Sequence, residues 1–292
     1  MRLDPFGYET NWLAVDDGLR LAYQVIGEGP TVVLSNGLGG TFHAWRHIYL
    51  HLAERYRVVS WDFRGTHGSD APRDRSAITV PHHVDDLQRL LEHWGVDRAL
   101  FLGWSMGVQV NFELYRREPQ LFAGIGVING TAGRAFDPIN AKITTRYAST
   151  TVLEAMQRHA NLFSRAIKAA IALPGLVTIA KRFGLVAPSL DEDVFHDVAM
   201  DFADLDFELF GAMLESLGDH DAWDVLPNVD VPVTVMAGDK DIMTPVESAS
   251  RMSQILPDAR LVVVPGGTHY APLEAADIII QAVDELIERC GY

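Results

Sequence analysis

The stretch "LGWSMGVQV", residues 102–110, places a serine between two glycines at the end of an apolar run. The pattern Gly-x-Ser-x-Gly arises by chance about 0.1 times in a chain of this composition, so on its own it is only a hypothesis. The apolar run from Ala99 predicts a strand, and "VQVNFELYRRE" after the pentad predicts a helix. In a sharp turn between a strand and a helix, flanking glycines let a serine hydroxyl project above the sheet edge. The stretch therefore predicts that Ser105 is a nucleophile.

Apolar runs rich in β-branched residues recur along the chain, with helical patterns between them. The predicted strands are 21–26, 31–34, 57–61, 99–102, 124–128, 233–237 and 261–264. The predicted helices are 41–54, 81–94, 107–117, 245–255 and 273–289. Several strands are continuously apolar, as strands buried on both faces are. The alternation predicts an α/β fold with a mostly parallel sheet and helices on both faces.

The alternation stops between residues 134 and 223, where only helical patterns occur. We therefore expect one core domain, residues 1–133 and 224–292, interrupted by a helical insertion at 134–223. Phenylalanines of the insertion are expected to form its own core, to line an apolar pocket, or both. They are Phe136, Phe163, Phe183, Phe195, Phe202, Phe207 and Phe210.

The composition limits the classes of partner. A formal net charge of −15 disfavours nucleic acid and anionic lipid and favours small-molecule ligands. The single cysteine, Cys290, excludes an intramolecular disulfide and a cysteine-based metal site. The sequence shows neither a secretory leader pattern nor an apolar run of membrane-spanning length, so we expect a cytoplasmic protein. Nothing in it indicates a metal or cofactor, and it does not predict the oligomeric state.

A serine nucleophile needs a base, and a neutral imidazole is the usual one. His269 follows a predicted buried strand in the glycine-rich loop "GGTHYAPLE", while His67, His82 and His83 are weaker candidates. The histidine needs a carboxylate to fix its tautomer. "GDKD", residues 238–241, offers two, Asp239 and Asp241, and either one could instead cap a helix or form a turn.

Five motifs in this order resemble the α/β-hydrolase fold family over nearly the whole chain. "LSNGLGG" (34–40) is similar to the family's oxyanion loop and "WDFRGTHGSD" (61–70) to its Asp-x-Arg-Gly turn. "GWSMG" resembles its nucleophile elbow, "GDKD" its acid loop and "GGTHYAPLE" its histidine loop. The resemblance implies an eight-stranded sheet with an inserted helical cap, and it selects Asp241 over Asp239.

The resemblance also implies an oxyanion hole made by the backbone N–H groups of Leu38 and Met106. Met106 begins the helix after the serine, where free N–H groups and the positive end of the helix dipole favour negative charge. Two positions depart from the family pattern. Asn36 stands where many members have histidine, and His67 stands where glycine is usual. "SNGLGG" is also similar to the corresponding loop of enol-lactone hydrolases.

The sequence thus predicts a serine esterase without metal or cofactor, in which Ser105, Asp241 and His269 act on a small apolar ester through an acyl-enzyme intermediate. Ser105 argues against dehalogenase and epoxide hydrolase activity, which use aspartate at this position. Lactonase, enol-lactonase, carbon–carbon bond hydrolase, amidase, thioesterase and perhydrolase chemistry stay open. A non-catalytic ligand-binding protein of the same fold is the alternative from another class.

Overall fold

The computed structural model describes residues 8–15, 18–134, 158–171 and 175–292. Its strands form a single eight-stranded sheet in the order β1-β2-β4-β3-β5-β6-β7-β8. The strands are β1 (Glu9–Ala14), β2 (Arg20–Ile26), β3 (Thr31–Ser35), β4 (Arg57–Trp61), β5 (Ala99–Trp104), β6 (Phe122–Ile128), β7 (Val233–Gly238) and β8 (Ala259–Val264). β2 pairs antiparallel with β1 and β4, and the remaining pairs are parallel. The predicted α/β fold with a mostly parallel sheet is confirmed.

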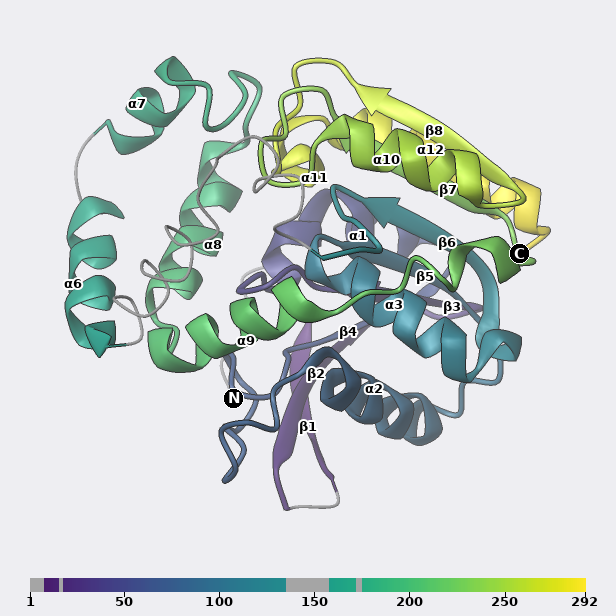
Figure 1. The fold of residues 1–292 in the computed structure, drawn as a ribbon, viewed down its shortest axis with the longest axis horizontal. Helices are drawn as coiled ribbons and strands as arrows, with labels where there is room; N and C mark the ends of the chain where they lie inside the picture. The colour runs from purple at the N-terminus through teal and green to yellow at the C-terminus, as the bar shows by residue number, and fades with distance from the viewer. Residues whose placement is uncertain (1–7, 16–17, 135–157, 172–174) are drawn as a thin grey trace.

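Helices cover both faces of the sheet (Figure 1). They are α1 (Arg46–Leu52), α2 (Val80–Trp94), α3 (Met106–Arg117), α10 (Val246–Ile255), α11 (Ala271–Glu274) and α12 (Ala276–Cys290). Successive side chains of β3 pack in different apolar clusters, on opposite faces of the sheet. Val33 packs in the cluster that contains α2 and α3, and Val32 packs in the one that contains α1 and α12. Burial on both faces explains why the central strands are continuously apolar.

Two predicted helices differ from the structure. Phe42–Trp45 form a 3-10 turn, and α1 begins only at Arg46, because Trp45 lies outside the helical backbone region at φ −96° and ψ 4°. The predicted helix 273–289 is divided into α11 and α12, because Ala275 lies outside the helical backbone region at φ −143° and ψ 48°. At the end of α12, burial raises the pKa of the Cys290 thiol to about 11, which makes it a poor nucleophile.

Four described α-helices lie between β6 and β7: α6 (Ala160–Ile171), α7 (Leu176–Arg182), α8 (Glu192–Ala203) and α9 (Phe207–Asp219). In Figure 1 they are drawn teal to green, beside the carboxyl ends of the parallel strands. No single helix in the described ranges is long and apolar enough to span a membrane, although the bent pair α6 and α7 together meets the length and composition criteria. Phe136 lies outside the described residues.

Candidate active site

Ser105 lies in a strained turn at the junction of β5 and α3. Its φ of 53° and ψ of −115° lie in a region that residues other than glycine rarely adopt. A Cβ at Gly107 would lie 2.1 Å from the Ser35 carbonyl oxygen, and one at Gly103 would lie 2.8 Å from Asn111 Nδ2. Both glycines of the pentad are therefore needed for close packing. β5 ends against α3 with the serine at the turn between them.

The imidazole of His269 reaches the serine from the loop after β8. Its Nε2 is 2.9 Å from Ser105 Oγ, and its Nδ1 is 2.9 Å from Asp241 Oδ2. An ionised carboxylate can only accept, so Nδ1 must carry the proton, and Nε2 is left free to accept the serine proton. The structure thus brings the three predicted residues into one hydrogen-bonded chain. Asp239 is not part of it, because its Oδ1 accepts from the Gly266 N–H over 2.8 Å and closes a turn.

The Asp241 carboxylate is buried and surrounded by donors. Oδ1 accepts from the N–H groups of Met243 and Thr244 over 2.8 and 2.9 Å, and Oδ2 accepts from Thr244 Oγ1 over 2.6 Å. Burial alone would raise the pKa of Asp241, but the hydrogen bonds and charge of His269 and the bonds from Thr244 outweigh it, so the pKa is lowered. Asp241 therefore stays ionised and able to orient the imidazole.

Asn129, after β6, is a further donor to Asp241 that no motif in the sequence indicated. Its Nδ2 donates to Asp241 Oδ2 over 2.7 Å and to the Thr268 carbonyl over 3.1 Å. The residue has a φ of 44°, and asparagine tolerates the left-handed region better than most residues. The only sequence signal was an asparagine before Gly130, directly after a buried strand.

The loop 36–40 faces Ser105 from the end of β3. Asn36, which replaces the expected histidine, is fully buried and satisfied: Oδ1 accepts from Trp45 Nε1 over 2.8 Å, and Nδ2 donates to the Trp61 carbonyl over 2.7 Å. A Cβ at Gly37 would lie 3.3 Å from Ser105 Cβ, so the loop backbone approaches the serine closely. Leu38 makes no backbone hydrogen bond within the described chain that would occupy its N–H.

His67, the second departure from the family pattern, has a φ of 45°. It thus takes the left-handed conformation for which glycine is the usual residue. The turn is kept, since the next N–H, of Gly68, donates to Asp62 Oδ2 over 3.0 Å.

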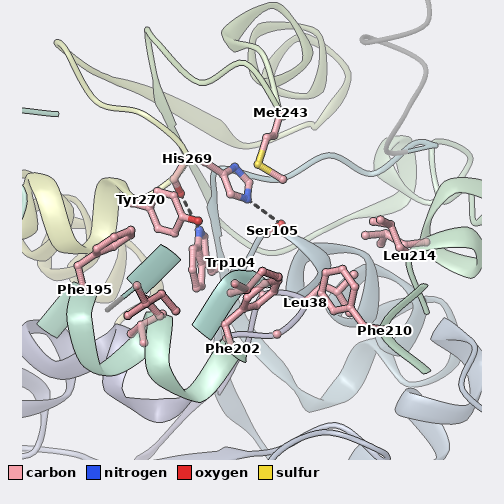
Figure 2. A pocket seen from close by; sticks show the side chains of 18 of the residues that line it. Leu38, Trp104, Ser105, Phe195, Phe202, Phe210, Leu214, Met243, His269 and Tyr270 are labelled. Atoms are coloured by element: carbon pink, nitrogen blue, oxygen red, sulfur yellow. Dashed lines mark hydrogen bonds between the residues drawn. The ribbon is translucent and has the colours of Figure 1, made fainter. Parts of the chain in front are cut away.

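A cavity of about 380 Å³ opens over Ser105 and His269 (Figure 2). It is bounded by the loop 37–40, by Met243 and by apolar side chains of the helices between β6 and β7. Its lining side chains are apolar except for those of Trp104, Ser105, His269 and Tyr270. Trp104 Nε1 donates to the His269 carbonyl over 2.9 Å, so the tryptophan both lines the pocket and supports the histidine loop.

Four of the phenylalanines between β6 and β7 take one of the two predicted roles. Phe195, Phe202 and Phe210 line the pocket. Phe207 is buried and contacts Phe202 and Phe210, with ring centroids 5.5 and 5.8 Å apart. Phe183 takes neither role, because it is 75% exposed.

Comparison with known proteins agrees with this geometry. The profile of the alpha/beta hydrolase fold matches residues 30–276, which span the sheet from the start of β3 to the beginning of α12. The chain belongs to the alpha/beta hydrolase fold family.

Relatives in this family have several hydrolytic activities. A provisionally named carbamate hydrolase, RutD, of Caulobacter sp. (strain K31) is 30% identical, covering 91% of this chain and 94% of that protein. The 3-oxoadipate enol-lactonase 2 of Acinetobacter baylyi is 25% identical, covering 97% and 98%. The structure of a thermophilic esterase from Thermogutta terrifontis superposes with a TM-score of 0.76 at 22% identity, covering 97% and 100%, which is a likeness of fold.

Glu274 is a second residue near the hydrolase site that no motif in the sequence indicated. Its Oε1 accepts from the Ala187 N–H over 2.7 Å and from Thr268 Oγ1 over 2.6 Å, while Oε2 accepts from the Thr268 N–H over 2.7 Å. One buried carboxylate thus ties the histidine loop to the segment before α8.

A third contact joins α8 to the segment that directly follows the loop 36–40. Asp201 Oδ2 is 2.9 Å from both His43 Nδ1 and Thr41 Oγ1. Burial opposes ionisation of Asp201, but the hydrogen bond and charge of His43 and the bond from Thr41 lower its pKa. In the described part of the chain, no group of three or more histidine, cysteine or acidic side chains has an arrangement that could hold a metal ion.

Proposed function

We propose that this hydrolase cleaves a carboxylic ester of a small, uncharged, apolar substrate through an acyl-enzyme intermediate. The observation that carries the proposal is the hydrogen-bonded chain from Ser105 through His269 to Asp241 at the base of an apolar pocket. A nucleophile, a base and an orienting carboxylate at these distances fulfil the geometric requirements of serine hydrolysis.

In the proposed reaction, His269 Nε2 takes the Ser105 proton while Oγ attacks the ester carbonyl carbon. The oxyanion is held by the backbone N–H groups of Leu38 and Met106, the latter at the start of α3, where the helix dipole favours negative charge. His269 then gives the proton to the leaving alcohol. A water molecule, deprotonated by His269, releases the acid and restores the serine, and Asp241 stabilises the imidazolium in both halves.

The pocket favours an uncharged acyl group. Apolar side chains from α6, α8 and α9 surround the serine, and no lysine or arginine occurs among the lining residues that the structure describes. A substrate carboxylate would lose its hydration there without gaining a counter-ion. We further propose that the insertion, residues 134–223, acts as a cap that provides this apolar wall.

Neutral lactones are the second candidate, since a lactone is a cyclic ester and the same groups would open it. The similarity to an enol-lactonase over 97% of this chain favours this alternative. A panel of p-nitrophenyl esters of increasing chain length, measured beside uncharged lactones, separates the two. Faster hydrolysis of medium-chain esters than of every lactone supports the ester proposal, and the reverse order supports lactonase activity.

A further inference from the structure

Tyr270 carries the only unengaged polar side-chain group in the described lining of the pocket. Ser105 and His269 are hydrogen-bonded to each other, and Trp104 Nε1 donates to the His269 carbonyl. Tyr270 hydrogen-bonds through its backbone N–H to Thr268 Oγ1, whereas its hydroxyl makes no hydrogen bond to the described residues. A ligand that excludes water from the pocket without pairing this hydroxyl would leave a costly unpaired donor, whereas a ligand with an acceptor oxygen would not.

The ring of Tyr270 is held in place by three aromatic neighbours. Its centroid lies 5.2 Å from that of Phe195, in an edge-to-face arrangement, and 6.1 and 6.2 Å from the centroids of Trp104 and His269. Figure 2 shows the ring between Phe195 and the His269 imidazole, with its hydroxyl on the side nearer Ser105. These contacts hold the ring, so its hydroxyl has a fixed position in the lining of the pocket.

The surroundings keep this hydroxyl protonated. Burial raises the pKa of Tyr270, and the negative charges of Glu274 and Asp241 raise it further. Glu274 does not accept from the hydroxyl, because its oxygens accept from the backbone of Ala187 and from Thr268. A neutral phenol in an otherwise apolar wall is a hydrogen-bond donor suited to an uncharged acceptor such as a ketone or ether oxygen.

We infer that Tyr270 is a specificity-determining residue, which donates a hydrogen bond to a second, uncharged oxygen of the substrate. The inference rests on the proposed ester or lactone hydrolysis and narrows its substrate class. The substrate would have a largely apolar body, a scissile carbonyl at Ser105 and a further acceptor oxygen within reach of the Tyr270 hydroxyl.

The test uses p-nitrophenyl nonanoate and its 4-, 5-, 6- and 7-oxo derivatives, with the wild type and Tyr270→Phe. A net hydrogen bond is worth a factor of about 3 to 10, so we expect the wild type to prefer one oxo isomer by this factor in kcat/KM. Tyr270→Phe should reduce this preference to below about twofold. The ratio of two substrates on the same variant cancels any general loss of activity. Tyr23→Phe, in which the lost hydroxyl contacts His93 outside the pocket, should keep the preference.

The inference is overturned if no oxo isomer is preferred or if Tyr270→Phe keeps the preference. If no variant hydrolyses any ester, the proposed function fails, and Tyr270 is then tested by binding alone. Calorimetry would measure the dissociation constants of the matching methyl esters for Ser105→Ala and for Ser105→Ala with Tyr270→Phe. Tighter binding of one oxo ester that disappears with Tyr270→Phe supports the inference, and equal ratios in both proteins contradict it.

Discussion

Asn129 donates from Nδ2 to Asp241 Oδ2 over 2.7 Å, from a backbone conformation with φ 44°. The carboxylate that orients His269 is therefore held from β6 as well as from its own loop. Asn129→Ala removes this donor, and at about 1.5 kcal/mol or more for one hydrogen bond to a charged group we expect kcat to fall by at least about tenfold. Steady-state kinetics against a p-nitrophenyl ester checks this, with the exposed Asn228→Ala as control. An unchanged kcat in folded Asn129→Ala would show that the donor has no role in turnover.

Glu274→Gln should weaken the link between the histidine loop and the segment before α8. The amide NH₂ replaces an oxygen that accepts from the backbone N–H of Ala187 or Thr268, so donor faces donor. We expect a loss of about 1 to 3 kcal/mol in the free energy of unfolding, measured by urea denaturation. The control is Glu288→Gln, at an exposed position of α12. Equal stability of the two variants would refute a structural role for Glu274.

The contact between Asp201 and His43 should couple α8 to the 3-10 turn that follows the loop 36–40. A carboxyl whose folded pKa lies below its unfolded value stabilises the fold above the unfolded pKa, and this stability is lost as the pH falls through the folded pKa. Asp201→Asn should therefore lower the unfolding free energy at pH 7, and its effect should shrink as the pH is lowered towards the folded pKa of Asp201. It should also raise KM, because the neighbouring Phe202 lines the pocket. A double-mutant cycle with His43→Gln measures the coupling, and additive effects would rule it out.

The buried His83 should make the unfolding free energy depend on pH, independently of the active site. It is fully buried on α2, and burial and then the charge of Arg64 lower its pKa from 6.5 to about 3. In the unfolded chain, the His83 imidazole binds a proton below about pH 6.5, while in the folded chain it stays neutral until the pH nears 3. The histidine therefore removes up to about 1.4 kcal/mol of stability per pH unit as the pH falls from 6.5 towards 3.

His83→Leu removes the group that takes up about one proton on unfolding, so it should flatten the dependence of the unfolding free energy on pH. Urea unfolding at pH 7, 6 and 5 measures this dependence. His196→Leu, at an exposed position of α8, is the matched control and should keep the slope. Identical slopes in the two variants would mean that His83 is protonated in the folded protein.

The central strands were predictable because burial on both faces leaves continuous apolar runs. β1 was missed because it is an edge strand whose residues are all exposed or partly exposed, with Trp12 53% exposed, so it carries no such run. The positions of Ser105, Asp241 and His269 followed from local motifs at strand ends, where a parallel sheet brings distant residues together.

The contacts of Asn129, Glu274 and Asp201 were not predictable, since they join segments far apart in the sequence. Glu274 meets Ala187 across 87 residues, and Asp201 meets His43 across 158. The spacing of apolar residues in the sequence gives no information about such a contact. Asn36 shows the same limit: its departure from the family pattern was visible, but its replacement partners, Trp45 and Trp61, appear only in the fold.

The central claim is that Ser105 is a nucleophile activated by His269 and Asp241. The most direct measurement is covalent labelling by a fluorophosphonate, located by mass spectrometry, in the wild type, Ser105→Ala and Asp241→Asn. Asp239→Asn and the exposed Ser189→Ala serve as matched controls. We predict labelling of Ser105 in the wild type and both controls, none in Ser105→Ala, and a rate at least about 10³-fold lower in Asp241→Asn. A folded wild type that is not labelled, or a label on another residue, would contradict the claim.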